Sequence, residues 1–374
     1  MHCLTTITCI VCLAFVYCEF LADFFQLSHC MWATLSPENV KNKNEELKAM
    51  IIADTHLVGP IRGHWLDRLY REWHMHRSFQ ATMRLLNPDV VFILGDLFDE
   101  GDFVNNRQFD QYVQRFHRIF STPSGVPIIS AVGNHDVGFH YKMDNRFINR
   151  FSNYFNNTGV EMYTIKGNHF VLINSMAMLN DGCGFCNAAL RDLNRISAQL
   201  KCLQNSKKCN DSYTLKKHKT YSRPILMQHF PTYRKSDAVC REHDSPVIEL
   251  FRENWEVLSK KSTDFIGALL MPRVSFAGHS HHYCLSINRF GIEEYTVASF
   301  SWRNKIEPSF LLASFSSTTY SVSKCDMLPQ QHVFDIYITS VILMLVTITW
   351  HFYRKFLKKP SVSKHIPTNS LKLD

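Results

Sequence analysis

The feature that most constrains the fold is a short, unbroken apolar run over residues 90–94. Asn87-Pro88-Asp89 precede this run, and Gly95-Asp96 follow it. A run of this length between turn residues indicates a strand buried on both faces, as in a sheet covered by helices. In open α/β sheets, ligands bind at the carboxyl ends of the strands. Asp96 stands at such an end, although an ordinary Asp-rich turn would give the same local sequence.

Four other apolar runs end in polar residues in the same way. The predicted strands 47–53, 126–132, 224–228 and 273–277 run into Asp54-Thr55-His56, Gly133-Asn134-His135-Asp136, His229 and Gly278-His279-Ser280-His281. Helical spacing over 66–86 and around 109–120 separates the first three strands. This alternation predicts a layered α/β domain. A strand pair is predicted at 162–165 and 170–174. Three later stretches, around 284–287, 294–300 and 310–315, predict a second sheet packed on the first.

Both ends of the chain are apolar. Residues 4–27 carry only Glu19 and Asp23 as charges, and no small-residue cleavage site follows, so a membrane anchor is favoured over a signal peptide. Residues 333–352 are long enough to cross a bilayer as a helix. Arg354, Lys355, Lys358 and Lys359 follow them, which places the C-terminal end in the cytosol and the catalytic region in the lumen.

The predicted organisation therefore has five parts. These are an N-terminal membrane anchor or signal over 1–30, a linker over 31–46, a lumenal domain over 47–325, a transmembrane helix over 333–352 and a cytosolic tail over 353–374. The charge of +8 is spread over lysine-rich linkers and the tail. Because no basic helix with interleaved aromatic residues is present, nucleic acid is not expected as a partner.

The twelve cysteines divide between the apolar N-terminus, which has four, and the remaining chain, which has eight. Two glycosylation sequons, at Asn156 and Asn210, indicate a secretory compartment, where thiols oxidise. We therefore expect Cys183, Cys186, Cys202 and Cys209 to form two disulfides. The sequence leaves all three pairings open. A zinc site is the alternative.

Seven of the strand-end side chains are candidate metal ligands: Asp54, His56, Asp96, Asn134, His229, His279 and His281. Each short pattern also occurs by chance, but the order of the set and its placement after strands make it specific. Imidazole and oxygen donors without a thiolate suit Mn, Fe or Zn. The sequence thus predicts a metal centre where the strand ends meet.

The series Asp-x-His, Gly-Asp-x-x-Asp, Gly-Asn-His-Asp, His and Gly-His-x-His resembles that of the calcineurin-like metallophosphoesterases, and residues 54–281 carry all of it. The resemblance implies an α/β sandwich of two packed mixed β-sheets flanked by helices, with two divalent metal ions, Mn²⁺ being the expected ion. Asp54, His56 and His281 would hold one ion, Asn134, His229 and His279 the other, and Asp96 both. His135 would protonate the leaving group, and Asp99 would orient His135. The cations would activate water and neutralise phosphate oxygens.

One position departs from many phosphoprotein phosphatases of this fold. Those enzymes have an arginine directly after the second aspartate of Gly-Asp-x-x-Asp, whereas this chain has Glu100. We expect a negative side chain there to disfavour a phosphomonoester dianion and to suit a diester monoanion.

The run from Asp54 to Gln80 resembles a narrower group, the eukaryotic phosphodiesterases that act on ethanolamine phosphate of the GPI anchor. The resemblance implies removal of this group from a mannose, with GPI-anchored proteins as substrates, at membranes between endoplasmic reticulum and Golgi. Cargo or coat-sorting factors are further candidate partners. Lys372, third from the end, resembles a retrieval signal that lacks its second lysine. The alternatives are a phosphomonoesterase, a phospholipid diesterase, or an inactive cargo receptor.

Overall fold

The computed structural model describes residues 2–35, 46–157, 159–205, 209, 214 and 220–357. The linker centre, Asn210 and the tail with Lys372 therefore lie outside the described residues. The chain divides into two compact units, Ala22–Gln330 and a second unit made of Met1–Leu21 with Gln331–Asp374. The larger unit contains both sheets and all of the predicted site residues.

The first sheet has the strand order β12-β11-β1-β2-β3. Its strands are β1 (Leu47–Ile52), β2 (Val90–Leu94), β3 (Ile128–Ala131), β11 (Ser309–Phe315) and β12 (Tyr320–Asp326). Strands β1, β2 and β3 are parallel, whereas β11 is antiparallel to both β1 and β12. The carboxyl ends of the three parallel strands therefore lie at the same edge of the sheet.

The second sheet has the order β4-β5-β6-β8-β10-β9-β7. Its strands are β4 (Val160–Ile165), β5 (Asn168–Ile173), β6 (Ile225–Gln228), β7 (Glu242–His243), β8 (Val274–Ala277), β9 (Cys284–Ile287) and β10 (Glu293–Thr296). Strands β5, β6, β8 and β10 are parallel, and the outer pairs are antiparallel. The predicted α/β fold of two mixed sheets is confirmed, but the stretch 310–315, expected in the second sheet, lies in the first sheet as β11 beside β1.

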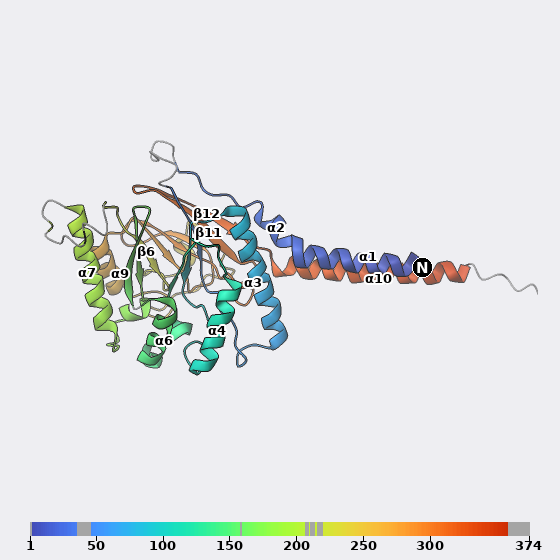
Figure 1. Cartoon of the computed structure of the whole chain (residues 1–374), viewed down its shortest axis with the longest axis horizontal. Helices are drawn as coiled ribbons and strands as arrows, with labels where there is room; N and C mark the ends of the chain where they lie inside the picture. The colour runs from blue at the N-terminus through green and yellow to red at the C-terminus, as the bar shows by residue number, and fades with distance from the viewer. Residues whose placement is uncertain are drawn as a thin grey trace, which may run out of the picture. The chain divides into compact units, whose positions relative to one another are not determined.

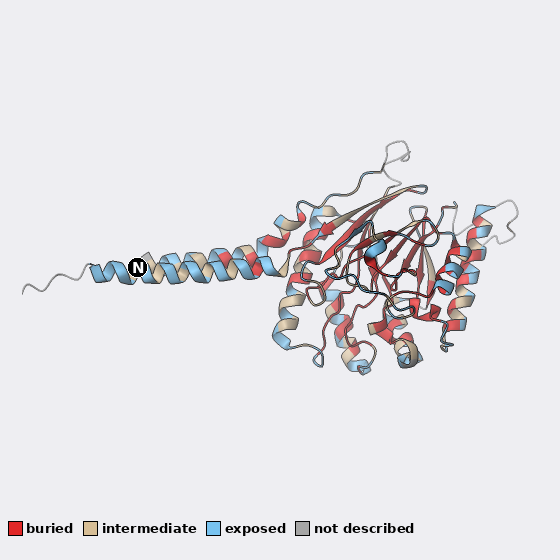
Figure 2. Cartoon of the chain, turned by 180° about the vertical axis from the view of Figure 1, so that it is seen from behind, coloured by how far each residue is buried: buried red, intermediate tan, exposed pale blue. Residues whose placement is uncertain are grey.

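The two faces of β1 separate two cores. Ala49 and Ile51 belong to a cluster that also contains Phe92 and Phe276, from strands of different sheets, so this cluster fills the space between the sheets. Met50 and Ile52 point to the other face and pack with side chains of the helices. Figure 2 shows the strands buried along most of their length, as expected for sheets covered on both faces.

Helices cover the outer face of each sheet. Figure 1 shows α3 (Trp65–Leu86) and α4 (Asn106–Ile119) beside the first sheet, and α7 (Cys186–Gln204) and α9 (Lys260–Leu270) beside the second. The shorter helices of this unit are α2 (Ala22–Leu27), α5 (Asn134–Val137), α6 (Asn145–Phe155), η4 (His140–Lys142), η5 (Ser175–Met178) and η7 (Asp237–Val239). Helix α3 ends where predicted, because Asn87 adopts the left-handed conformation and Pro88 follows it.

Strand β12 and helices α6 and α9 are among the elements that were not predicted from the sequence. Strand β12 lies at the edge of its sheet, and its side chains are mostly half-buried, so its sequence lacks a continuous apolar run. Helix α6 is rich in asparagine, which has low intrinsic helix propensity, and is stabilised instead by burial of Ile148 and Phe151. Helix α9 packs on α7 through a face that includes Ile266 and Leu270.

The predicted pair of disulfides is confirmed and resolves into Cys183–Cys186 and Cys202–Cys209. Two more disulfides, Cys30–Cys325 and Cys240–Cys284, join segments that are distant in sequence. Asn156, the sequon asparagine within the described residues, is exposed at the C-terminal end of α6. Its side chain is thus accessible for modification.

The smaller unit contains α1 (His2–Val16), the π-helical turn η1 (Tyr17–Leu21) and most of α10 (Gln330–Leu357). Two helical stretches, Cys3–Leu27 and Gln330–Leu357, are long and apolar enough to cross a membrane. The acidic Glu19, unusual in such a segment, accepts a hydrogen bond from the Tyr337 hydroxyl at 2.6 Å. This contact gives the carboxylate a partner within the unit.

Candidate active site

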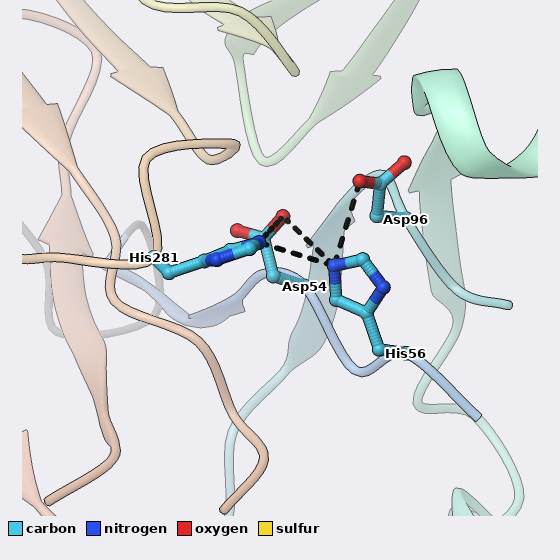
Figure 3. Close-up of side chains that lie close together, drawn as sticks. All are labelled: Asp54, His56, Asp96 and His281. Carbon is cyan, nitrogen blue, oxygen red and sulfur yellow. Dashed lines mark hydrogen bonds and ion pairs between the residues drawn. The ribbon is translucent and has the colours of Figure 1, made fainter. Parts of the chain in front are cut away.

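The seven predicted ligands come from the ends of parallel strands and lie together in two groups that share Asp96. The first group consists of Asp54, His56, Asp96 and His281. Figure 3 shows these four side chains pointing toward one another. His56 Nε2 lies 3.1 Å from His281 Nε2 and 3.5 Å from Asp96 Oδ2. Asp54 Oδ1 lies 3.9 Å from His56 Nε2 and 3.7 Å from His281 Nε2.

The second group lies on the other side of Asp96 and contains His229, His279 and Asn134. His229 Nε2 is 3.3 Å from Asp96 Oδ2 and 3.0 Å from Asn134 Oδ1. His279 Nδ1 is 3.2 Å from His229 Nε2. Nitrogen and oxygen donors from three strand ends therefore converge on one small volume.

One carboxylate oxygen of Asp96 is fixed by a hydrogen bond, and the other oxygen faces both groups of candidate ligands. Asp96 Oδ1 accepts a hydrogen bond from the backbone N–H of His135 at 2.8 Å. Asp96 Oδ2 is the atom that lies close to His56 in one group and to His229 in the other. A single carboxylate oxygen is thus positioned between two sets of donors.

Hydrogen bonds on the far side of three imidazoles fix which nitrogen can bind a cation. His229 Nδ1 donates to the Leu94 carbonyl at 2.7 Å, and His279 Nε2 donates to the Trp255 carbonyl at 2.7 Å. Carbonyl oxygens only accept, so each of these nitrogens carries the proton. His56 Nδ1 lies 3.1 Å from Asp99 Oδ1 and donates to it. The opposite nitrogen of each ring is therefore the one that can bind a cation, as in metal-binding histidines.

The backbone of the site is strained where the side chains converge. Five of the seven candidate ligands adopt positive φ: Asp54, His56, Asp96, His279 and His281, with values between 42° and 72°. Such conformations cost about 1–3 kcal/mol each in non-glycine residues and concentrate at functional sites. A Cβ on Gly133 would lie 2.1 Å from Asp96 Oδ1, so only glycine permits this close approach. The Asp136 carboxylate stabilises the same turn, because it accepts hydrogen bonds from the backbone N–H groups of Gly133 and Phe98.

Bound cations would supply partners that the protein groups of the site lack. Asp54 Oδ1 is buried and, within the described residues, has no hydrogen-bond partner. Leaving such an atom unpaired is costly. His56 Nε2 and His281 Nε2 lie 3.1 Å apart, so one cation could take both nitrogens as ligands. Carboxylate, amide and imidazole donors match two divalent ions, which would polarise a phosphate and lower the pKa of water.

With this geometry in hand, we compared the chain with known proteins. The family model described as calcineurin-like phosphoesterase matches residues 47–283. The chain belongs to this family. It is 57% identical to the Metallophosphoesterase 1 homolog of Drosophila melanogaster over 91% of this chain and 90% of the relative, and 40% identical to Metallophosphoesterase 1 of Gallus gallus over 93% and 90%. A dimetal phosphatase structure from Danio rerio covers 75% of this chain and 99% of its own at 13% identity and a TM-score of 0.43.

As a calcineurin-like phosphoesterase, the chain is a metal-dependent phosphoester hydrolase with the donor set of a dimetal site. His135, the predicted acid, lies beside this set, with its ring 4.8 Å from that of His56. Its side chain is 32% exposed, unlike the buried His56 and His229. The His135 imidazole is therefore accessible to a substrate next to the metal ligands.

Arg62, which the sequence analysis did not single out, contacts His135. Its Nη1 donates to the Asp99 carbonyl at 2.6 Å and lies 3.1 Å from His135 Nδ1. The guanidinium only donates to His135 Nδ1, whereas the Asp99 carbonyl, 3.3 Å from the same nitrogen, only accepts, so these contacts do not select one tautomer. Arg62 and the Asp99 backbone together hold the His135 imidazole beside the candidate metal ligands. Arg62 follows the first ligand block by a few residues, but no spacing rule marks it.

The Asp99 carboxylate contacts a different histidine from the one expected, while the Asp99 backbone carbonyl lies 3.3 Å from His135 Nδ1. Asp99 Oδ1 is 3.1 Å from His56 Nδ1 but 3.9 Å from His135 Nδ1, which is too long for a hydrogen bond. Asp99 Oδ2 accepts from Arg303 at 2.7 Å. Burial opposes the charge of Asp99, but His56 and Arg303 hold its pKa below the ordinary value. The carboxylate thus orients a metal ligand, and Arg303, also missed from the sequence, anchors it.

Glu100 does not act as expected from its position in the motif. Its side chain is fully buried and accepts from the backbone N–H groups of Ile61 and Arg62 and from the Tyr112 hydroxyl. These three hydrogen bonds turn the carboxylate toward the loop that carries Arg62. Glu100 therefore positions this loop, a role that its place in the motif did not indicate, and its effect on a phosphate dianion stays a prediction. The arginines near the cluster, Arg62 and Arg303, come from other segments.

Burial and the charges of neighbouring groups shift the pKa values of the candidate ligands, upward for some residues and downward for others. Burial raises the pKa of Asp54 to about 8, with the Asp96 charge adding to the rise. Burial also opposes the charge of Asp96, but His229 and His135 hold its pKa well below the usual value. Burial acts against a proton on His229, yet Asp96 and Asp54 raise its pKa to about 9. Asp54 and His229 therefore both hold protons at neutral pH when no cation is bound.

We expect metal binding at pH 7 to release protons and metal affinity to rise between about pH 6 and pH 9, because Asp54 and His229 must lose their protons to bind cations. Titration of the metal-free protein with Mn²⁺, by calorimetry in two buffers of different ionisation enthalpy, measures this release. Binding without proton release, or with affinity that is flat across this pH range, would contradict the assigned protonation states.

Proposed function

We propose that this protein is a membrane-anchored, lumenal phosphodiesterase that removes an ethanolamine-phosphate branch from a mannose of the GPI anchor, with two Mn²⁺ ions. The observation that carries the proposal is the run from Asp54 to Gln80, which resembles that of the diesterases acting on this branch. The complete set of candidate ligands is assembled around Asp96 in the same chain. A bound diester would be placed beside His135, which supplies the proton to the departing sugar oxygen.

Two further features support the location that the proposal requires. Four disulfides suit an oxidising compartment, and two terminal helices are apolar enough to hold the chain in a bilayer. We propose residence at ER exit sites, the intermediate compartment and the cis-Golgi. GPI-anchored proteins would be the substrates, and removal of the branch would aid their transport from ER to Golgi with cargo or coat-sorting factors.

A phosphomonoesterase is the second candidate, and a specific observation favours it. Arg62 lies 3.1 Å from His135, and Arg303 lies 2.7 Å from Asp99, so two guanidinium groups stand near the cluster. Arginine suits the additional charge of a monoester dianion. An inactive cargo receptor, in contrast, has no need for a complete donor set or for strained ligand backbones.

The purified full chain with Mn²⁺ is tested on three substrates: a GPI glycan carrying mannose-linked ethanolamine phosphate, bis-p-nitrophenyl phosphate, and p-nitrophenyl phosphate. We expect release of ethanolamine phosphate from the first, slow cleavage of the second and little of the third. Remote parts of a substrate contribute binding energy that is used to orient the reacting bond, so the truncated diester should lose kcat as well as affinity.

Mass spectrometry of the glycan and release of p-nitrophenol provide the readouts. Faster turnover of the monoester, with the GPI glycan left intact, would overturn the substrate assignment in favour of the second candidate. Absence of hydrolysis of all three substrates by a protein that retains its metal would favour the receptor. Asp264→Asn, at an exposed carboxylate on α9, serves as a control for the effect of mutation itself.

A further inference from the structure

A cavity of about 850 Å³ opens between the loop that follows Asp99 and helices α4 and α6. Figure 1 shows these two helices next to each other. The volume is within the range of about 300–1,000 Å³ that is usual for ligand pockets. None of the seven candidate metal ligands lines this cavity. It is therefore a separate feature of the larger unit.

Amides and aromatic rings dominate the cavity lining. Four asparagines line it: Asn105, Asn106, Asn149 and Asn153. Phe103 and Tyr154 also line it, and these rings are 41% and 42% exposed. Large aromatic side chains left this accessible in a polar cavity are a feature that folding alone does not require.

The charged groups of the cavity already have partners. Arg146 pairs with Asp144, and Arg150 donates to the carbonyls of Gly101 and Val104. Asp110 accepts from the Tyr154 hydroxyl. The lining thus combines amides with two guanidinium groups, the exposed one of Arg146 and the buried one of Arg150.

This combination fits a sugar. The amide oxygens of Asn105 and Asn106 accept from Gln108 and Arg150, whereas the exposed amides of Asn149 and Asn153 each have a donor and an acceptor side by side, which matches neighbouring hydroxyl groups of a pyranose. Exposed aromatic rings provide flat apolar surface for the C–H face of the same ring. An acyl chain, in contrast, would require a lining without so many amides. The amides and exposed aromatic rings of the lining thus point to an oligosaccharide.

A continuous set of contacts joins this cavity to the candidate active site. Phe103 lies under the guanidinium of Arg62, with 4.9 Å between the guanidinium carbon and the ring centroid. The same guanidinium is 3.1 Å from His135 Nδ1. The cavity therefore begins on the side of the metal cluster where His135 would protonate the leaving group.

We propose that the cavity between α4 and α6 binds the sugar residues attached to the leaving-group oxygen of the diester. This assignment rests on the proposed function, because it takes a glycan to be the leaving group. The phosphate would lie at the metal ligands, its departing oxygen near His135, and the following sugars along Phe103 toward Asn149 and Asn153. Glycan binding would then hold the diester in position for attack.

The test uses the double variant Asn149→Ala with Asn153→Ala in the full chain. Both side chains are exposed on one face of α6, four residues apart, so their removal should not disturb the core. We expect the ratio of kcat/KM for the glycan diester to kcat/KM for bis-p-nitrophenyl phosphate to fall by about tenfold or more. Only the glycan diester has sugars whose hydrogen bonds to the two amides would be lost. The matched control, Asn187→Ala with Asn194→Ala on α7, should leave this ratio unchanged.

A second measurement separates failure of this inference from failure of the proposed function. The phosphate-free mannose oligosaccharide is titrated into the wild-type full chain and into both double variants by calorimetry. Binding that is lost only in the α6 variant supports the cavity assignment, even if the wild type leaves the glycan diester uncleaved. An unchanged ratio, or oligosaccharide binding that is absent in the wild type or retained in the α6 variant, would overturn it.

Discussion

Asp96→Asn should abolish phosphoester hydrolysis and weaken both metal sites, because one carboxylate oxygen serves both groups of ligands. Asp96 Oδ1 is held by the N–H of His135, so the oxygen of an asparagine would remain there. The amide nitrogen would then take the place of Oδ2, next to His56 and His229. Two N–H donors would face the cations in place of a shared anion. We therefore expect a larger loss than the 10²–10⁴-fold, roughly, that follows removal of a general acid.

Hydrolysis of bis-p-nitrophenyl phosphate with added Mn²⁺ measures this effect. Asp264→Asn makes the same chemical change at an exposed α9 carboxylate that pairs with Arg289, and it should retain wild-type activity. Circular dichroism of both variants monitors the fold. An Asp96→Asn protein that is folded and retains more than about a hundredth of the activity would show that the shared carboxylate is not essential.

His135→Ala should lose about 10²–10⁴-fold in turnover while retaining its metal, since His135 lies beside the ligand groups rather than within them. The loss should be smaller for aryl esters with a good leaving group, because such a group departs without a proton. His117→Ala, at an exposed histidine on α4, provides the control and should have no effect.

The dependence on the leaving group is the decisive readout for His135. A series of aryl diesters of increasing leaving-group pKa should show a steeper fall in rate for His135→Ala than for the wild type. Parallel slopes would mean that His135 does not supply the proton. Loss of metal from His135→Ala would instead make this residue part of the metal site.

The sequence could predict the positions of the candidate metal ligands because each is a local feature. Each follows a strand that was recognisable from its apolar run, and the parallel strands β1, β2 and β3 bring Asp54, Asp96 and Asn134 to one edge without further information. The same reasoning applies to His229 and His279 after the neighbouring strands β6 and β8. Most of the candidate site residues could therefore be predicted from their position at the end of a strand.

The surrounding residues could not be predicted because they depend on contacts between segments. Arg303 is 204 positions from Asp99 in sequence, and no pattern marks it. Glu100 follows Asp99 directly, yet its side chain turns away to the loop with Ile61 and Arg62. A motif fixes where the backbone of a residue lies. The direction of a buried side chain depends on which hydrogen-bond donors other segments supply.

The same limit applies to the fold. The disulfide Cys30–Cys325 joins residues 295 positions apart, so only the structure could pair them. The pairs Cys183–Cys186 and Cys202–Cys209 are close in sequence and were expected as a set of four, but their pairing was open. Edge strand β12 escaped prediction because its half-buried face gives no apolar run.

The central claim is that Asp96 joins two cation sites, and elemental analysis of metal bound to the purified protein tests it most directly. We predict about two divalent ions per chain in the wild type and in His135→Ala, and marked loss of both ions in Asp96→Asn. A wild-type protein that is active with one ion per chain, or an Asp96→Asn protein that retains both ions, would contradict the account.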